Sequence, residues 1–449
     1  MMRLRDYQLR AVETARRIIA DGAKSVLINS PTGSGKTVIA AAIVQSAVQK
    51  GRRVLFLAHR RELIQQCSAK LTEAGVIGHG VIMAGSGLKN HLAPVQVASI
   101  QTLIRREWPP AHLIIIDECH RAIAGQYQTI LANYPDAIVL GLYATPERLD
   151  GKGLSDLFSH MVTVDTVPGL IARGYLVKPI CYAGTESDLS QVRTSRGDYR
   201  ESDLQDALDK PRLVGDIVKN WTRLANGKRT VAFAAGVEHA RHIAQEFWSA
   251  GIPAASIDGI MRNSERDAII ADWKAGIIQV VTNCEVLCEG FDFPALECAI
   301  LARPTKSVSL YLQMVGRVMR SHPGKTAAYV LDHAGCIATH GAPHLAREWS
   351  LEGEKRRSGT ALALHARHTE PPERQTDFDC LDGDLERIDD ALIPIGVRVK
   401  NDFKHLIDQA RSRGWKRGYV WHRLREQYDE ATLRQHIPRH RGEWWRATA

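Results

Sequence analysis

The octapeptide S-P-T-G-S-G-K-T at residues 30–37 has the residue types and spacing of a loop that binds phosphate. It lies between an apolar run typical of a strand and an Ala/Ile/Val-rich stretch typical of a helix. Gly33 and Gly35 permit a tight wrap, so that backbone N–H groups at the helix start can cradle phosphate oxygens. Lys36 is expected to reach the phosphates, and the hydroxyl of Thr37 to ligate Mg²⁺.

Two acidic residues end a second apolar run, L-I-I-I-D-E-C-H at residues 113–120. Ligands of parallel α/β sheets bind beyond the carboxyl ends of the strands, which places these acids beside the 30–37 loop. Asp117 is expected to hold Mg²⁺ through water, and Glu118 to polarise an attacking water as general base. On its own this acidic pair would suit a helix N-terminus equally well, but the phosphate loop favours the catalytic interpretation.

Short β-branched runs alternate with helical patterns along the first 340 or so residues, which is typical of parallel sheets covered by helices. In the first half, strands are expected at 25–29, 53–58, 95–98 and 113–116, and helices at 36–50 and 60–74. In the second half, strands are expected at 231–235, 254–257, 277–281, 298–301 and 327–331, and helices at 237–250, 264–275 and 308–320. The pattern predicts two α/β domains in tandem.

The tetrapeptide Asp117-Glu118-Cys119-His120, placed after a phosphate loop, resembles the DECH variant of the superfamily 2 DEAD/DEAH-type helicases. Further segments resemble that family's motifs in the family's order. They are the Q motif at 4–8, motif Ia at 58–64, a strand-contacting element at 99–103, motif III at 143–145, motif IV at 231–237, motif V at 282–292 and motif VI at 313–320. The resemblance covers roughly residues 3–335 and is of the bacterial or phage kind.

The resemblance implies two RecA-like domains that bind ATP and Mg²⁺ between them. It implies ATP binding by Gln8, Gly33, Ser34, Gly35, Lys36, Thr37, Gly290 and Asp292. Gln8 would read the adenine edge, and Gly290 and Asp292 would approach the sugar. Arg317 and Arg320 are three residues apart on one predicted helix, so both could face a phosphate cluster and stabilise transition-state charge.

Coupling of hydrolysis to strand movement is implied for His120, Thr145 and Gln313. The family's motif III begins with Ser, and Tyr143 replaces it here, which leaves the coupling role to Thr145. Contacts to the nucleic acid are expected from Arg60, Arg61, Thr102 and Thr282, and in the C-terminal region from Trp415, Lys416, Arg417 and Trp421.

Charge is distributed unevenly in a chain whose net charge is +9. Residues 369–390 contain nine acidic residues against two arginines, which is typical of a solvated linker. Residues 397–449 contain thirteen Lys or Arg against six acids, and four of the nine Trp residues. Cations mixed with flat rings suit phosphate attraction and base stacking, while a small helical core built on the Trp residues, or a docking site for a protein partner, stays open.

The expected division is therefore a first RecA-like domain at 1–170, a second at 171–345, an extension with the acidic linker at 346–395, and a small, mainly α-helical basic domain at 396–449. An apolar stretch such as 137–144 is far shorter than the roughly 18 residues of a membrane span, so no membrane contact is expected. The start of the sequence shows no export signal, and we expect a cytoplasmic protein, in a bacterium or in the host of a phage.

The favoured function is an ATP-dependent helicase or translocase acting on DNA. DNA is favoured over RNA because the DEAD box and the P-T-R-E-L-A form of motif Ia, typical of RNA helicases, are absent. An RNA helicase and a double-stranded DNA translocase that never unwinds stay open. A non-catalytic recruitment factor that binds nucleic acid would be a different class, but it would not need Lys36, Glu118 or Arg317.

Overall fold

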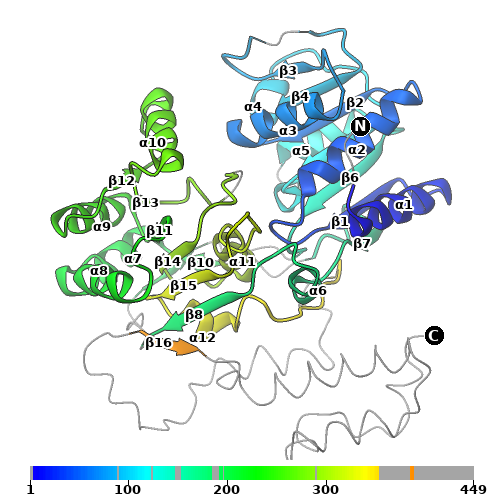
Figure 1. Ribbon diagram of the computed structural model, residues 1–449. Helices are drawn as coiled ribbons and strands as arrows, with labels where there is room; N and C mark the ends of the chain where they lie inside the picture. Colours follow the sequence, from blue (N-terminus) through cyan, green and yellow to red (C-terminus); the bar gives the residue numbers. More distant parts are fainter. Residues whose placement is uncertain are drawn as a thin grey trace, which may run out of the picture.

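The computed structural model describes residues 4–87, 90–122, 125–146, 153–184, 192–195, 197–288, 291–352 and 385–388. These residues form two α/β lobes, coloured blue to cyan and green to yellow in Figure 1. The prediction of two tandem domains with parallel sheets is confirmed. The predicted basic C-terminal domain at 396–449 lies outside the described residues.

The first sheet consists of β1 (Ser25–Asn29), β2 (Val54–Ala58), β3 (Gly80–Ile82), β4 (Val95–Ser99), β5 (Leu113–Asp117), β6 (Ile138–Tyr143) and β7 (His160–Thr163). Its order is β3-β4-β2-β5-β6-β1-β7, and every neighbouring pair is parallel. Every residue of β2 and β5 is buried, as expected for parallel strands covered on both faces. This burial explains why these strands are almost uninterrupted apolar runs.

Helices cover both faces of this sheet. One face packs against α1 (Asp6–Ala20), α2 (Lys36–Gln49) and α3 (Arg61–Glu73). The other packs against α4 (Ile100–Leu103), the short 3-10 helix η1 (Cys119–Arg121) and α5 (Gly125–Ala132). Strand residues alternate between the two cores, since Val26 and Ile28 belong to the first and Leu27 to the second. Helix α6 (Val167–Ala172) follows β7.

The second sheet consists of β8 (Pro179–Ala183), β11 (Thr230–Ala234), β12 (Ala254–Ile257), β13 (Val280–Asn283), β14 (Cys298–Ala302), β15 (Ala328–Asp332) and β16 (Glu386–Ile388). Its order is β12-β13-β11-β14-β15-β8-β16, and only β16 runs antiparallel to its neighbour. The helices of this lobe are α7 (Glu201–Leu208), α8 (Pro211–Leu224), α9 (Val237–Ser249), α10 (Asn263–Ala275), α11 (Val308–Gly316) and α12 (Cys336–His340). A small ribbon pairs β9 (Thr194–Ser195) with β10 (Asp198–Tyr199).

Strand β16 lies within the segment predicted to be an acidic linker. It pairs with β8, and the backbone of Leu385 bonds to the side chains of Asn220 and Arg223 on α8. The Leu385 side chain is 2% exposed. The charge pattern did not predict this strand, because acidic residues dominate the segment. Two apolar residues among the acids are nevertheless enough for the segment to pair with the edge of β8.

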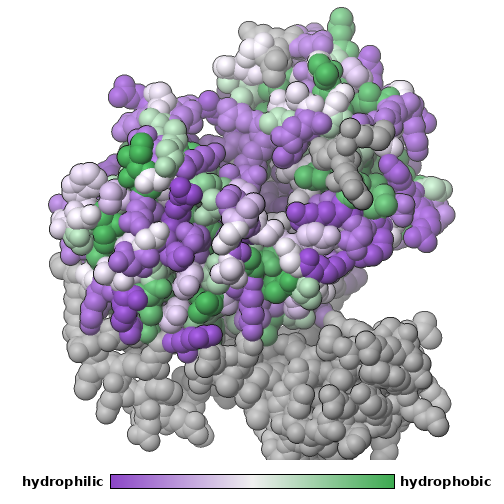
Figure 2. All heavy atoms as spheres, in the orientation of Figure 1, coloured by the Kyte–Doolittle hydropathy of each residue, from purple (hydrophilic) through white to green (hydrophobic). Residues whose placement is uncertain are grey.

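The two domains pack closely enough to share one apolar cluster, which continues from the first domain through Leu176 to Met314 and Val315 of α11. In the space-filling view the surface is hollowed between the two lobes, and the side chains around this hollow are mostly hydrophilic (Figure 2). Within the described ranges, we find no helix with the length and apolar character needed to cross a membrane.

Candidate ATP site between the two domains

The phosphate loop lies between β1 and α2, as the sequence predicted. Gly33 and Gly35 have φ values of 87° and 89°, in the left-handed region that favours glycine, and Lys36 is the first residue of α2. The first amides of a helix lack intrahelical acceptors, so this helix start suits an anion. Ser30, which replaces the usual first glycine, is fully buried, and its Oγ lies 2.5 Å from Oγ of Ser34. Ser30 therefore bonds to another residue of the same loop.

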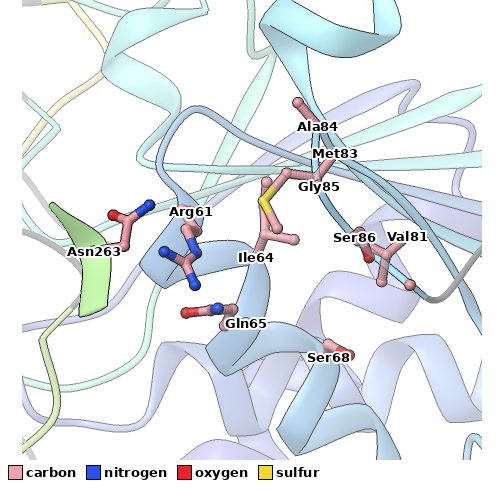
Figure 3. A pocket seen from close by; sticks show the side chains of 11 residues that line it. Arg61, Ile64, Gln65, Ser68, Val81, Met83, Ala84, Gly85, Ser86 and Asn263 are labelled. Carbon is pink, nitrogen blue, oxygen red and sulfur yellow. The ribbon is translucent and has the colours of Figure 1, made fainter. Parts of the chain in front are cut away.

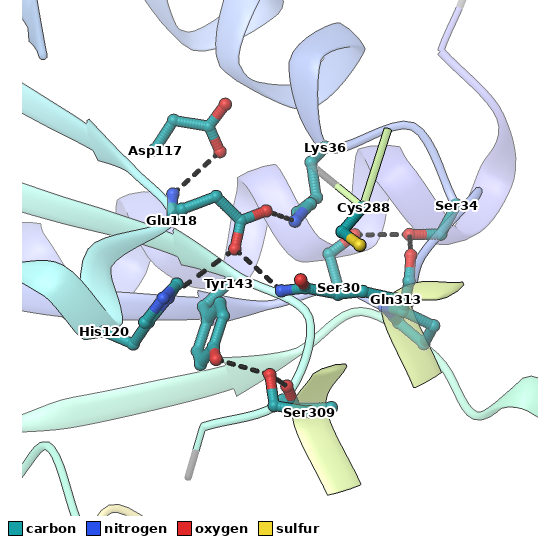
Figure 4. A network of polar contacts seen from close by, with 12 residues as sticks. Ser30, Ser34, Lys36, Asp117, Glu118, His120, Tyr143, Cys288, Ser309 and Gln313 are labelled. Atoms are coloured by element: carbon teal, nitrogen blue, oxygen red, sulfur yellow. Dashed lines mark hydrogen bonds and ion pairs between the residues drawn. The ribbon is translucent and has the colours of Figure 1, made fainter. Parts of the chain in front are cut away.

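The two predicted acids stand at the end of β5 beside this loop. The Nζ of Lys36 lies 2.5 Å from Oε1 of Glu118, and both side chains are largely buried (Figure 4). Burial lowers the pKa of Lys36, but the charges of Glu118 and Asp117 outweigh it, so the net pKa is raised. Burial also raises the pKa of Asp117, against the opposing charge of Lys36. Lys36, Asp117 and Glu118 therefore form one tightly coupled charge cluster.

The residues present fit an ATP phosphate group with Mg²⁺. The hydroxyl of Thr37 and the carboxylate of Asp117 are the hard oxygen donors that Mg²⁺ prefers. Among the residues that the structure describes, no group of three or more His, Cys, Asp or Glu could hold a metal ion by itself. Mg²⁺ at Thr37 and Asp117 would therefore take its remaining ligands from phosphate oxygens and water.

The second domain reaches this cluster through α11. The Nε2 of Gln313 donates a hydrogen bond of 3.3 Å to Oε2 of Glu118. A side chain built at Gly316, the last residue of α11, would place its Cβ 2.5 Å from Cβ of Thr32 in the phosphate loop. A Cβ at Gly33 would likewise meet the side chain of Leu176 at 2.9 Å. The loop is thus directly covered by the second domain.

The predicted arginine pair does not lie on one helix, contrary to the expectation from the sequence. Helix α11 ends at Gly316, not at residue 320, so Arg317 and Arg320 do not share a helix but lie on the turn that follows. The guanidinium of Arg317 donates to the carbonyl oxygens of Cys288 and Phe291, which both lie in the motif V segment. Beyond Gly316 the backbone N–H groups of Arg317 and Val318 bond to residues three back in the chain instead of four, so the α-helical hydrogen bonding stops there.

Arg320 shares one of these acceptors. It donates to the carbonyl of Phe291 and pairs with the carboxylate of Asp292. Burial lowers the pKa of Arg320, and Asp292 opposes that effect. A Cβ at Gly33 would lie 3.1 Å from Cγ of Arg320, so the turn that bears both arginines lies near the phosphate loop. Gly290 lies outside the described residues.

Gln8 lies on α1 against the phosphate loop. It is 3% exposed, and its Nε2 donates to the carbonyl oxygen of Ser34 at 2.9 Å. Its Oε1 accepts from the backbone N–H of Arg5, and the hydroxyl of Tyr7 donates to the same Ser34 oxygen. The structure therefore brings Gln8 to the loop, where it bonds to the backbone at Ser34.

Of the residues predicted to couple hydrolysis to strand movement, His120 and Gln313 contact Glu118, and Thr145 contacts α11. The Nδ1 of His120 lies 3.6 Å from Oε2 of Glu118. Thr145 is 1% exposed, and its hydroxyl donates to Oγ of Ser309 on α11 at 2.6 Å. His120, Thr145 and Gln313 thus lie at the same contact between the two domains.

The residues predicted to contact nucleic acid differ in where the structure places them. Arg60 crosses the domain boundary, where its Nη1 donates to the backbone carbonyls of Glu285 and Val286. Thr102 is half-buried on the short helix α4. Thr282 does not fit its expected role, because it is fully buried in β13 and its hydroxyl donates to the carbonyl of Ala240 at 2.6 Å.

A pocket of about 520 Å³ lies beside the start of α3 (Figure 3). Arg61 and Gln65 of α3 form part of its wall, together with Met83 and Ser86 near β3. Asn263 of α10 completes it from the second domain. The expected C-terminal contacts Trp415, Lys416, Arg417 and Trp421 lie outside the described residues.

Sequence reasoning missed Ser309 and the contact between Gly316 and Thr32. Ser309 precedes Gln313 by four residues, a spacing that puts both on one face of a helix. This four-residue spacing is the signal from which Ser309 could have been predicted to lie beside Gln313. Nothing in the sequence indicated that the phosphate loop would approach the end of α11, because the contact depends on how the two domains meet.

Two family models match the chain in succession. Residues 1–148 match the family "Type III restriction enzyme, res subunit", and residues 209–322 match the "Helicase conserved C-terminal domain". The structure of an ATP-dependent Type ISP restriction-modification enzyme, LlaBIII, bound to DNA is similar over 73% of this chain and 27% of its own, with a TM-score of 0.54 and 19% identity. At that identity the likeness concerns the fold alone.

Two relatives match over most of the chain. The "51.5 kDa protein" of Lactococcus phage (isolate 7-9) is 36% identical over 344 residues, which are 76% of this chain and 73% of that protein. The "Putative ATP-dependent helicase IRC3" of Saccharomyces cerevisiae is 31% identical over 354 residues, 74% of this chain and 51% of the yeast protein. This chain therefore spans about half the length of its yeast relative. With these relatives and the family models covering both domains, the chain belongs to the superfamily 2 helicases.

Proposed function

We propose that the chain hydrolyses ATP at the contact between its two domains and uses the cycle to move along DNA. The observation that carries this proposal is the position of Glu118. Its carboxylate contacts Lys36 of the first domain and Gln313 of the second at the same time. A general base that contacts both domains can sense whether they are closed.

Within this site, Lys36 would bind the β- and γ-phosphates, and the loop amides would bind their oxygens. Mg²⁺, held through Thr37 and Asp117, would neutralise charge on the phosphates. Glu118 would leave Lys36 and accept a proton from the attacking water. The burial of Asp117 and Glu118 supports these roles, because a water-excluded site strengthens each electrostatic interaction.

Arg317 and Arg320 would stabilise the charge that develops on the transferred phosphoryl group. The position of the turn that bears both arginines supports this role, because a Cβ at Gly33 in the phosphate loop would lie 3.1 Å from Cγ of Arg320. Asp292 would hold Arg320 in position. For Gln8 we propose a role at the adenine edge, next to the loop carbonyl that it already binds.

The nucleic acid would lie along the side of the domain contact that bears motif Ia. Arg60, Arg61 and Thr102 would meet its backbone there, and the pocket between α3 and α10 would widen or narrow as the domains move. We do not assign Thr282 to this surface, because its hydroxyl is used inside the protein. Trp415, Lys416, Arg417 and Trp421 would add stacking and charge from the C-terminal region.

DNA is the proposed track. Three observations support this choice: the restriction-enzyme family that matches residues 1–148, the fold shared with the DNA-bound enzyme LlaBIII, and the DECH sequence at 117–120. We place the activity in the cytoplasm of a bacterium or of the host of a phage, since a phage protein is among the relatives. A protein partner at the C-terminal region is a further part of the proposal.

The cycle would begin with the domains closed on ATP and end with their release after hydrolysis. Because the nucleic acid crosses both domains, each closure moves the nucleic-acid contacts of one domain relative to those of the other. Hydrolysis measured with single-stranded DNA, duplex DNA and RNA tests the proposal. Stimulation by DNA above that by RNA is expected, and equal rates with and without any polymer would contradict it.

A further inference from the structure

Tyr143, the residue that replaces the family's motif III serine, lies between the charge cluster around Glu118 and the second domain (Figure 4). It ends β6 and is 1% exposed. Its ring stacks on the ring of His120, with centroids 4.4 Å apart and planes inclined by 26°. Its hydroxyl lies 2.6 Å from Oγ of Ser309 on α11. One side chain thus contacts residues of both domains.

On the first-domain side, the stacked His120 leads to the general base. The Nδ1 of His120 lies 3.6 Å from Oε2 of Glu118, the oxygen that also accepts from Gln313. The ring of Tyr143 therefore supports the histidine that flanks the Glu118 carboxylate. A serine at position 143 would provide no ring for this stacking.

On the second-domain side, the contact is concentrated on one helix face. Ser309 and Gln313 are four residues apart on α11 and face the same way. Ser309 meets the hydroxyls of Tyr143 and Thr145, both at 2.6 Å, and Gln313 meets Glu118. A movement of α11 would therefore break the bonds to Tyr143 and to Glu118 together.

From this geometry we infer that Tyr143 is a positioning residue that couples domain closure to the orientation of Glu118. The inference rests on the proposed function, in which Glu118 is the general base. When α11 docks, the hydrogen bond to Ser309 fixes the phenol, and the fixed ring holds His120 beside the Glu118 carboxylate. When α11 withdraws, this support for Glu118 is lost.

The burial of both hydroxyls makes the bond specific to the closed arrangement. Tyr143 is 1% exposed and Ser309 6% exposed, so neither hydroxyl has water as a ready alternative while the domains are in contact. After separation, water can satisfy both groups. The bond therefore contributes to one state of the cycle and not to the other, which is what a coupling element requires.

The test compares Tyr143→Phe, Ser309→Ala and the double variant with the full chain. Tyr143→Phe keeps the ring that stacks on His120 and removes only the hydroxyl. Tyr134→Phe is the matched control, because the Tyr134 hydroxyl donates to the carbonyl of Pro109 at 2.7 Å within the first domain. For each protein, kcat and KM for ATP are measured without polymer and with saturating single-stranded DNA, duplex DNA or RNA, and Tm is measured in parallel.

For Tyr143→Phe, we expect the stimulation of kcat by nucleic acid to fall about threefold to tenfold, as for one lost hydrogen bond, with KM for ATP within about twofold. Ser309→Ala should lose at least as much stimulation, because it also removes the hydrogen bond from Thr145. The double variant should lose no more than the larger single loss, because both changes remove the same bond. Tyr134→Phe should keep the stimulation of the unmodified chain. A merely structural role would lower Tm without changing the stimulation.

Unchanged stimulation in Tyr143→Phe, or single losses that multiply in the double variant, would overturn the inference. The proposed function fails by a different result. It fails if no polymer stimulates the unmodified chain, or if Glu118→Gln hydrolyses ATP at the normal rate. Normal stimulation in Tyr143→Phe together with an inactive Glu118→Gln would reject the coupling role of Tyr143 and leave the proposed ATP site intact.

Discussion

Lys36 and Glu118 form an ion pair in which Nζ of the lysine lies 2.5 Å from Oε1 of the glutamate. The two residues come from the start of α2 and the end of β5, and their side chains are 16% and 5% exposed. In the proposed reaction the lysine must bind phosphate and the glutamate must bind water. The two groups therefore exchange partners when ATP enters, and the γ-phosphate competes with Glu118 for the lysine.

Glu118→Gln should lower kcat by about 10²- to 10⁴-fold, the usual contribution of a general base. KM for ATP should fall, because the amide has no charge with which to compete with the γ-phosphate for Lys36. Steady-state hydrolysis and nucleotide binding measure the two effects. Glu297→Gln is the control, since it disrupts the ion pair with Lys228 without touching this site. Normal turnover in Glu118→Gln would remove Glu118 from the catalytic role.

Lys36→Ala should also abolish turnover, but it carries a stability cost. It leaves the carboxylate of Glu118 buried without its cation, and breaking a buried pair from one side costs about 3–5 kcal/mol. Thermal unfolding should show this loss. A Lys36→Ala protein that is as stable as the unmodified chain would indicate that Glu118 finds another partner or takes up a proton.

Gly316→Ala tests whether closure over the phosphate loop is needed for hydrolysis. Its Cβ would meet Thr32, and overpacking of this kind costs about 1–3 kcal/mol, so kcat/KM for ATP should fall about fivefold to hundredfold. Gly215→Ala is the matched control, because Gly215 lies on α8 with no atom close to its added Cβ. That control should have normal activity and unchanged or slightly higher stability. Equal activity of both variants would argue against closure at this contact.

His239 should make the protein less stable in mild acid. It is 1% exposed, its Nδ1 accepts from the backbone N–H of Ala235, and burial lowers its pKa to about 4. Below the ordinary histidine pKa of about 6.5, the unfolded chain binds a proton that the folded chain does not. Stability should therefore fall as the pH falls from about 6.5 to 4, by at most about 1.4 kcal/mol per pH unit from this group.

His239→Asn keeps an acceptor for the Ala235 N–H and removes the titration. The free energy of unfolding, measured by denaturant between pH 4 and 7, should decline less steeply in this variant than in the unmodified chain. The comparison isolates His239 because all other titrating groups are shared. Identical slopes would mean that His239 is not held neutral in the folded protein.

Deletion of residues 397–449 should weaken nucleic-acid binding and flatten its salt dependence. Each lost phosphate contact removes about 0.7 from the slope of log affinity against log salt on single strands. Binding titrations at several salt concentrations give this slope, and hydrolysis without polymer serves as a check that the ATP site is intact. A slope equal to that of the full chain would assign this region to a protein partner.

Much of the fold could be predicted because parallel strands and their helices have strong periodic signals. Strand β12 occupies the predicted residues 254–257, and α2 ends one residue before the predicted end at 50. The predicted end of α11 was wrong by four residues, because the apolar pattern continues past Gly316 while the N–H groups of Arg317 and Val318 bond three residues back instead of four. Such a local change in hydrogen bonding leaves no trace in the apolar period.

The components of the ATP site were predictable one by one, but their pairing was not. The loop and the acids each follow a strand, which fixes them at one edge of the first sheet. The meeting of Glu118 with Gln313, and of Tyr143 with Ser309, depends on the approach of the second domain. Thr282 has a separate reason. Its type suits a phosphate contact, but it lies inside β13 of the second domain, where it is buried and its hydroxyl bonds to the carbonyl of Ala240.

The central claim, that nucleic acid controls hydrolysis at the contact between the two domains, is tested most directly by steady-state ATP hydrolysis. Rates are measured without polymer and with single-stranded DNA, duplex DNA and RNA of matched length, for the unmodified chain and for Glu118→Gln. The account predicts strong stimulation by single-stranded or duplex DNA, and a kcat about 10²- to 10⁴-fold lower in Glu118→Gln. Appreciable hydrolysis that no polymer alters would contradict it.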